Sequence, residues 1–188
     1  MSKVLFACSK GTESAEFSCS YDILKRAGAD LTIAKVPEND KDTEKYFTTA
    51  HGIKVIADKT IDEVKDNKYD MIVCPGGLPN AEILGQNKTL IEMIKKQKKE
   101  GRWYCAICAS PCAVFEKNGI LEGEVGTGYP GYGELKDKSK CNERVVISNK
   151  CITSQGPWTA FEFGYALCKA LFGKEKKEQI QKDMLFKA

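Results

Sequence analysis

Cys108 is the residue of this 188-residue chain that is best placed to act as a nucleophile. The segment YCAICASPCAVF, residues 104–115, is apolar up to Cys108 and then changes to small residues that suit a helix. A thiol at such a break projects from the end of a sheet, where the first N–H groups of the helix have no partners. These N–H groups and the helix dipole favour a thiolate over a thiol. We therefore expect Cys108 to be reactive, with a pKa below that of a free thiol.

Three other interpretations of this cysteine compete with the first. It can be one of the buried apolar cysteines that are common in protein cores. Cys105 and Cys108 also form a C-x-x-C pair, but Cys105 lies inside the apolar run, where a strand would bury its side chain. A zinc site needs four donors at workable spacing; the chain has no second C-x-x-C, and its single histidine, His51, is remote in sequence. Neither a redox pair nor a bound metal is favoured.

The composition is typical of one globular domain. A length of 188 residues suits a single domain, and no linker or low-complexity segment divides it. The 29 basic and 26 acidic residues nearly balance, and the KKQKK segment at 95–99 is interpreted as a solvated helix face. The first residues lack the pattern of a secretory signal, and no apolar run approaches the roughly 20 residues of a membrane span. We expect a cytoplasmic protein without membrane or nucleic-acid partners.

The cysteines indicate a reducing compartment. There are nine, an odd number, and most lie inside apolar segments. A disulfide framework is typical of short secreted chains, so in a chain of this kind we expect free thiols.

Apolar runs alternate with amphipathic segments along the chain. Residues 3–9 read as a strand, residues 13–27 as a helix that ends before Gly28, and residues 29–36 as a second strand. This unit implies parallel strands. Further strands are expected at 69–74, in the run before Cys108, at 144–148 and at 151–154, and short strand or turn pieces at 53–57 and 60–64. Helices are expected at 88–99, directly after Cys108 and at 158–172, the last with a polar helical extension at 174–182. Residues 37–49 are expected to form a polar surface segment. The alternation predicts an α/β fold with a mostly parallel central sheet.

Gly76 and Gly77 follow the apolar strand expected at 69–74. Two glycines at such a place let the backbone approach a ligand and leave N–H groups free to face it, although most glycine pairs only form a turn. Ligands of parallel α/β sheets bind beyond the carboxyl ends of the strands. The glycine pair and Cys108 both fall at such ends.

Four separated segments resemble the ThiJ/PfpI superfamily, and within it the branch of the parkinsonism-linked protein deglycase DJ-one and bacterial YajL. They are KGTESAE (10–16), VCPGG (73–77), AICASP (106–111) and TSQGPWTAFEFG (153–164), followed by a matching GKEKKEQ tail. The ordered set spans almost the whole chain. The resemblance implies one domain over residues 1–188 with a flavodoxin-like three-layer sandwich, usually as a homodimer.

The resemblance also implies roles for single residues. Cys108 falls on the reactive cysteine of the superfamily, and Glu16 on the carboxyl that hydrogen-bonds its sulfur. Gly77 and Ala109 fall where backbone N–H groups form an anion-binding pocket, beside Gly76. By local sequence alone, Glu16 is an exposed carboxylate at a helix start. If it lies against the sulfur, desolvation and the thiolate should raise its pKa.

The chain departs from the superfamily at three positions. The histidine that many members have before a proline is replaced by Tyr129, so a Cys-His-Asp triad, and the protease activity of distant members, are not expected. Gln155 stands in place of an arginine, which weakens recognition of phosphate or carboxylate groups. Ile56 stands in place of a peripheral oxidisable cysteine. Tyr129 and Gln155 remain candidate pocket residues.

The function implied by the resemblance is that of a cysteine enzyme without cofactor or metal. It would detoxify methylglyoxal or glyoxal, or repair their protein adducts, as a glyoxalase III or deglycase linked to oxidative stress. Cys108 would add to the aldehyde, Glu16 would move the proton, and the N–H groups of Gly77 and Ala109 would hold the oxyanion. The alternative is a non-catalytic redox sensor or chaperone-like protein that acts through oxidation of Cys108.

Overall fold

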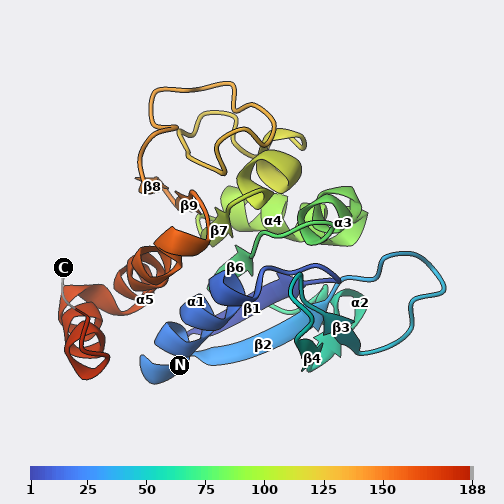
Figure 1. Cartoon of the computed structure of the whole chain (residues 1–188), viewed down its shortest axis with the longest axis horizontal. Coiled ribbons are helices and arrows are strands. Elements are labelled where there is room, and N and C mark those ends of the chain that lie inside the picture. The colour runs from blue at the N-terminus through green and yellow to red at the C-terminus, as the bar shows by residue number, and fades with distance from the viewer. Residues whose placement is uncertain (187–188) are drawn as a thin grey trace.

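A seven-stranded sheet with the order β5-β2-β1-β6-β7-β9-β8 forms the middle layer of the protein (Figure 1). The computed structural model describes residues 1–186. The strands of this sheet are β1 (Lys3–Cys8), β2 (Asp30–Lys35), β5 (Lys59–Thr60), β6 (Met71–Cys74), β7 (Trp103–Ile107), β8 (Val145–Ser148) and β9 (Cys151–Ser154). Neighbouring strands are parallel except for β8 and β9, which form an antiparallel hairpin. The predicted mostly parallel sheet is confirmed.

Helices cover both faces of the sheet (Figure 1). On one face α1 (Ser14–Arg26) packs against α5 (Ala160–Asp183). The other face is covered by α2 (Ile61–Val64), α3 (Asn80–Gln86), α4 (Lys88–Lys99) and a π-helical segment, Pro111–Glu116. None of the helices within residues 1–186 combines the length and the apolar character that crossing a membrane requires.

The strands alternate their side chains between two hydrophobic cores. In β1, Val4 and Phe6 belong to the core under α1 and α5, whereas Leu5 and Ala7 belong to the opposite core. Burial on both faces explains why the central strands read as nearly continuous apolar runs. The arrangement of helices, sheet and helices is the predicted α/β sandwich of flavodoxin-like type.

Some short elements differ from the prediction. Residues 60–64, expected as a strand or turn, are the end of β5 followed by α2, because Thr60 and Glu63 cap the helix reciprocally. Helix α3 was not predicted, since it is short and directly follows Pro79. The polar segment at 37–49 ends in β3 (Tyr46–Thr48), which pairs with β4 (Lys54–Ile56) in a separate antiparallel sheet.

The predicted end of the last helix at Gly173 is confirmed as a break within α5. Gly173 has φ 86° and ψ 175°, so helical geometry stops there and resumes in the polar segment that follows. Only glycine adopts such a backbone conformation without strain.

Two helical glycines differ in what a methyl group would meet. A Cβ at Gly85 would lie 2.2 Å from the Ala113 carbonyl oxygen, whereas one at Gly164 would lie 2.6 Å from Ile23 Cδ1, the end of a side chain. We expect Gly85→Ala to lower the free energy of unfolding by about 2–3 kcal/mol. Gly164→Ala should cost less, because its closest contact, Ile23, can move, the nearest backbone atom, Ser20 Cα, lies at 3.2 Å, and alanine favours a helix by about 1 kcal/mol. Urea denaturation measures both, and equal losses would contradict the close contact between α3 and the π-helical segment.

Candidate active site

Cys108 lies immediately after β7 in a left-handed backbone conformation, with φ 65°. A non-glycine residue rarely adopts this conformation, and such strain is concentrated at functional turns. Two backbone hydrogen bonds hold it: the Cys108 N–H donates to the Ser154 carbonyl at 3.0 Å, and its own carbonyl accepts from the Tyr129 N–H at 2.7 Å. The structure thus places Cys108 at the predicted strand-to-helix turn, although the helix that follows is π-helical.

Glu16 is fully buried in the first turn of α1. Its Oε2 accepts a hydrogen bond from the Gly76 N–H at 2.8 Å. Its Oε1 has no hydrogen-bond partner of good geometry within residues 1–186. The thiol of Cys108 lies close enough for the two side chains to affect each other's pKa. The structure therefore brings the two predicted reactive residues together, and Glu16 is not the exposed carboxylate that its local sequence suggests.

Burial is the main influence on the Glu16 carboxyl. It raises the pKa of Glu16 to about 7; the Glu13 carboxylate adds to this rise, while the Cys108 thiol and the Gly76 N–H oppose it. Desolvation raises the pKa of Glu16 as expected, but the Cys108 side chain lowers this pKa instead of adding to the rise, because it donates a hydrogen bond to the carboxylate.

The Cys108 thiol is harder to ionise than its sequence suggests. Burial raises the pKa of Cys108 to about 12, and the Glu16 carboxylate adds to this rise, while the N–H groups of Gly77 and Ala109 lower it. The prediction that the pKa of Cys108 is lowered is therefore wrong when Glu16 is ionised. Desolvation of the thiolate and the like charge of the carboxylate outweigh the two backbone N–H donors. Near neutral pH the thiol keeps its proton, and Glu16, with the lower pKa, is the base that can accept it during an attack.

The glycine pair fills the space between these groups. A Cβ at Gly76 would lie 2.5 Å from Cys108 Cβ and 2.7 Å from Glu16 Oε2. Gly77 has φ 85°, and a Cβ there would lie 2.1 Å from the Gly11 carbonyl oxygen. Any side chain at either position would displace the site. The N–H groups of Gly77 and Ala109 face the Cys108 sulfur, where they can stabilise negative charge.

The side chains of the other residues considered from the sequence have contacts of their own. The Tyr129 ring packs over Gly156, and the residue is 51% exposed. Gln155 donates from its side chain to the Cys141 carbonyl at 3.3 Å. His51 is exposed and lies 3.6 Å from Glu13 Oε1. Within residues 1–186, no cluster of three or more histidine, cysteine, aspartate or glutamate side chains is arranged to hold a metal ion.

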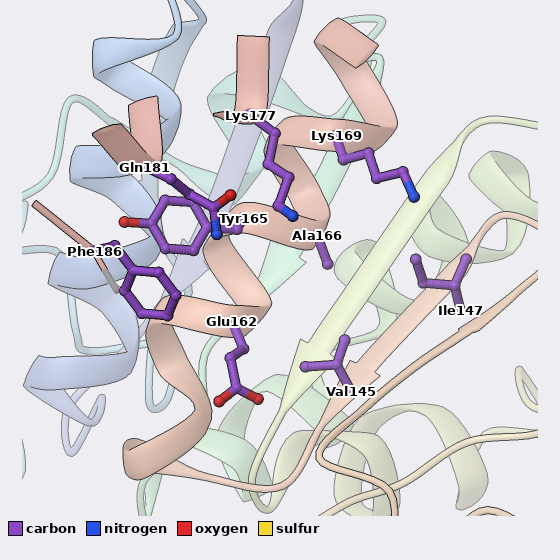
Figure 2. A pocket seen from close by; sticks show the side chains of 9 residues that line it. All are labelled: Val145, Ile147, Glu162, Tyr165, Ala166, Lys169, Lys177, Gln181 and Phe186. Atoms are coloured by element: carbon purple, nitrogen blue, oxygen red, sulfur yellow. The ribbon is translucent and has the colours of Figure 1, made fainter. Parts of the chain in front are cut away.

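Two hollows of the surface differ in their relation to Cys108. The nearer one, of about 300 Å³, is formed by residues 128–135 together with Cys112, Lys138, Cys141 and Asn142. The larger, of about 550 Å³, lies between β8 and α5, where Val145 and Ile147 face Tyr165 and Phe186 (Figure 2). Neither hollow is lined by Cys108, Glu16 or the glycine pair. The smaller one adjoins the Cys108 backbone, because Tyr129, which lines it, donates its N–H to the Cys108 carbonyl.

Sequence analysis did not identify two buried polar residues that hold the site. The Ser110 hydroxyl donates to the Pro75 carbonyl at 2.7 Å, which ties the Cys108 turn to the glycine segment. Asn80 donates to the same carbonyl at 2.8 Å. Each is a polar residue that closely follows a turn at a strand end, and this position in the sequence is the feature that could have identified it.

The raised pKa of Glu16 makes stability depend on pH. The folded protein keeps this proton up to about pH 7, whereas the unfolded chain releases it near pH 4.5. The free energy of unfolding should therefore fall by about 3 kcal/mol as the pH rises through this window. Glu16→Gln has no such proton, so its free energy of unfolding should rise by that amount relative to that of wild type over the same pH window. Urea denaturation between pH 4.5 and 8 measures it, with Glu122→Gln at an exposed carboxyl as the control. Parallel curves for wild type and Glu16→Gln would contradict the buried carboxyl.

Comparison with known proteins identifies the family. The chain matches the DJ-1/PfpI family over residues 2–170. It is 39% identical over 188 residues to Protein DJ-1 homolog A of Arabidopsis thaliana, covering 98% of this chain and 46% of that protein. The chain thus spans about half the length of that relative. It is 33% identical over 178 residues to Glutathione-independent glyoxalase DJR-1.2 of Caenorhabditis elegans, covering 92% of this chain and 89% of that one.

A solved structure of a relative has the same fold. The oxidized form of Toxoplasma gondii DJ-1 superimposes with a TM-score of 0.88 at 34% identity and covers 100% of both chains. The fold, the ordered motifs and the match over residues 2–170 lead to one conclusion. The chain belongs to the DJ-1/PfpI family.

Proposed function

We propose that this protein is a cofactor-independent glyoxalase that converts methylglyoxal or glyoxal into the corresponding 2-hydroxy acid. The observation that carries the proposal is the buried pair of Cys108 and Glu16, a nucleophile beside a carboxyl whose pKa is raised to about 7. Support also comes from the relative named as a glutathione-independent glyoxalase, which is 33% identical. A cytoplasmic location belongs to the same proposal.

The reaction begins with a covalent adduct. The Cys108 sulfur adds to the aldehyde carbon of methylglyoxal while the thiol proton passes to Glu16. Glu16 then gives this proton to the alkoxide, which completes a hemithioacetal. The N–H groups of Gly77 and Ala109 are positioned to stabilise the negative oxygen before it is protonated.

An internal proton transfer then produces the acid. The Glu16 carboxylate removes the proton from the carbon bonded to sulfur, and the resulting enediolate is reprotonated on the neighbouring carbon. The product is a lactate thioester of Cys108. Water cleaves the thioester and restores the thiol, so that methylglyoxal and water give lactate without an external oxidant or reductant. A carboxyl with a pKa near 7 suits this role, because it accepts and donates protons with similar ease at neutral pH.

The exposure of Cys108 bears on the choice of substrate. Only 9% of the residue is exposed, and the hollow that adjoins its backbone measures about 300 Å³. A free dicarbonyl of a few atoms can reach such a sulfur more readily than an adduct on a folded protein. We therefore place protein deglycation second to the free aldehyde.

The same burial argues against a sensor as the main function. Peroxide oxidises the thiolate, and the resting Cys108 thiol has a pKa raised to about 12 by burial and by Glu16. Adding to an aldehyde with Glu16 as base does not require a thiolate at rest. A redox sensor remains the alternative if turnover is absent.

Lactate formation from methylglyoxal tests the proposal. Cys108→Ala should lose about 10³-fold or more in kcat/KM, and Glu16→Gln about 10²-fold or more. Cys141→Ser, which removes a partly buried thiol outside the Cys108–Glu16 pair, should stay within about twofold of wild type. In heavy water, lactate should carry deuterium on its second carbon, because the enediolate exchanges with solvent. Turnover by Cys108→Ala equal to that of wild type would exclude the mechanism.

A homodimer is also part of the proposal, since members of this family usually pair through the first helix. Light scattering at micromolar concentration should give about twice the 20.8 kDa of one chain. A constant mass near that of a single chain would contradict it.

A further inference from the structure

The Asn80 side chain, in the first turn of α3, is fully buried and is hydrogen-bonded at both its oxygen and its nitrogen. Its Oδ1 accepts from the Ser9 N–H at 2.7 Å and lies 3.0 Å from the Thr12 hydroxyl. Its Nδ2 donates to the Pro75 carbonyl at 2.8 Å and to the Gly76 carbonyl at 3.0 Å. A backbone N–H on one side and two carbonyls on the other fix the orientation of the amide.

These partners belong to the two loops that carry the reactive groups. Ser9 and Thr12 lie in the loop between β1 and α1, which leads directly to Glu16. Pro75 and Gly76 follow β6, and the Gly76 N–H holds Glu16 Oε2. Asn80 thus connects the loop before the carboxyl to the loop that binds it.

The Cys108 turn is joined to the same point. The Pro75 carbonyl that accepts from Asn80 also accepts from the Ser110 hydroxyl at 2.7 Å. The Gly76 carbonyl that accepts from Asn80 also accepts from the Glu13 N–H at 3.0 Å. A single amide therefore braces three segments whose relative position sets the distance between sulfur and carboxyl.

We propose that Asn80 is the positioning residue that holds the Gly76–Gly77 backbone and the Glu16 carboxyl in register with the Cys108 sulfur. The kinetic part of this inference rests on the proposed glyoxalase function, but the geometric part concerns the reactivity of Cys108 alone. Asn80 acts through backbone groups, so its loss should reduce the rate of chemistry more than substrate binding. Small displacements of reacting groups cost large factors in rate.

Two substitutions remove the bracing in different ways. Asn80→Ala removes the nearer of two acceptors of the buried Ser9 N–H, leaving Thr12 Oγ1 at 3.2 Å, and removes one of two donors from each of the Pro75 and Gly76 carbonyls. Asn80→Asp keeps the shape and still accepts from Ser9, but an ionised carboxylate repels the carbonyls of Pro75 and Gly76. If the alanine variant does not fold, the aspartate variant tests the same two donated bonds.

Asn118 provides a matched control. Its Nδ2 also donates to two carbonyls, those of Gly85 at 3.0 Å and Val114 at 2.9 Å. These bonds join α3 to the π-helical segment but touch neither the glycine pair nor Glu16. If general packing of α3 were all that mattered, Asn118→Ala would disturb the site as much as Asn80→Ala.

The experiment measures the rate of Cys108 alkylation by iodoacetamide from pH 6 to 10, by mass spectrometry, in wild type and the three variants. We expect both Asn80 variants to react about fivefold or more slowly than wild type throughout this range, because the Gly77 N–H no longer faces the sulfur and a smaller fraction of the thiol ionises. Asn118→Ala should stay within about twofold of wild type. With methylglyoxal, kcat should fall about tenfold in the Asn80 variants, with KM within about twofold.

The outcomes separate the two proposals. Folded Asn80 variants whose alkylation profiles match that of Asn118→Ala would overturn the positioning role. If wild type forms no lactate, the glyoxalase function fails, and the alkylation profiles alone still support or overturn the role of Asn80.

Discussion

The site depends on the burial of Glu16 beside the Cys108 sulfur, which lowers the stability of the fold when the carboxyl is ionised. The carboxyl is fully buried and accepts one hydrogen bond, from the Gly76 N–H, while its second oxygen lacks a partner of good geometry within residues 1–186. A carboxylate in this setting loses its hydration without full compensation, so its pKa rises to about 7. The cost in stability is linked to the chemistry, because a carboxyl near neutrality can carry a proton in either direction.

The topology of the sheet brings the parts of the site together. Strands β1, β6 and β7 are consecutive in the sheet and parallel, so the loops at their carboxyl ends lie side by side. The first loop leads to Glu16, the second provides Gly76 and Gly77, and the third is the turn at Cys108. No one segment could form the site alone, which is the usual situation at the carboxyl edge of a parallel sheet.

Local signals in the sequence were sufficient for part of this arrangement. An apolar run that stops at a thiol, and another that stops at two glycines, predict strand ends, and both lie where expected. The position of Glu16 came only from resemblance, because nothing near it in sequence indicates burial. Its environment is made by Gly76, 60 residues away.

Long-range packing explains the features that the sequence did not reveal. The pKa of Cys108 was expected to fall, because the helix start is visible in the sequence and the desolvation that outweighs it is not. Asn80 was overlooked for the same reason: its acceptor oxygen binds the N–H of Ser9, 71 residues earlier. Short α3 lacks the periodicity that identified α1 and α4.

The protonation of Glu16 in the folded protein tests the account most directly. NMR of protein labelled with ¹³C at the glutamate carboxyl carbons, with the Glu16 signal assigned from Glu16→Gln, would follow its titration. We expect a midpoint near pH 7, which should move higher in Cys108→Ala because the thiol stabilises the ionised carboxyl. A midpoint near the ordinary value of 4.5 in both proteins would show a solvated carboxyl that is independent of the sulfur, and would contradict the paired site.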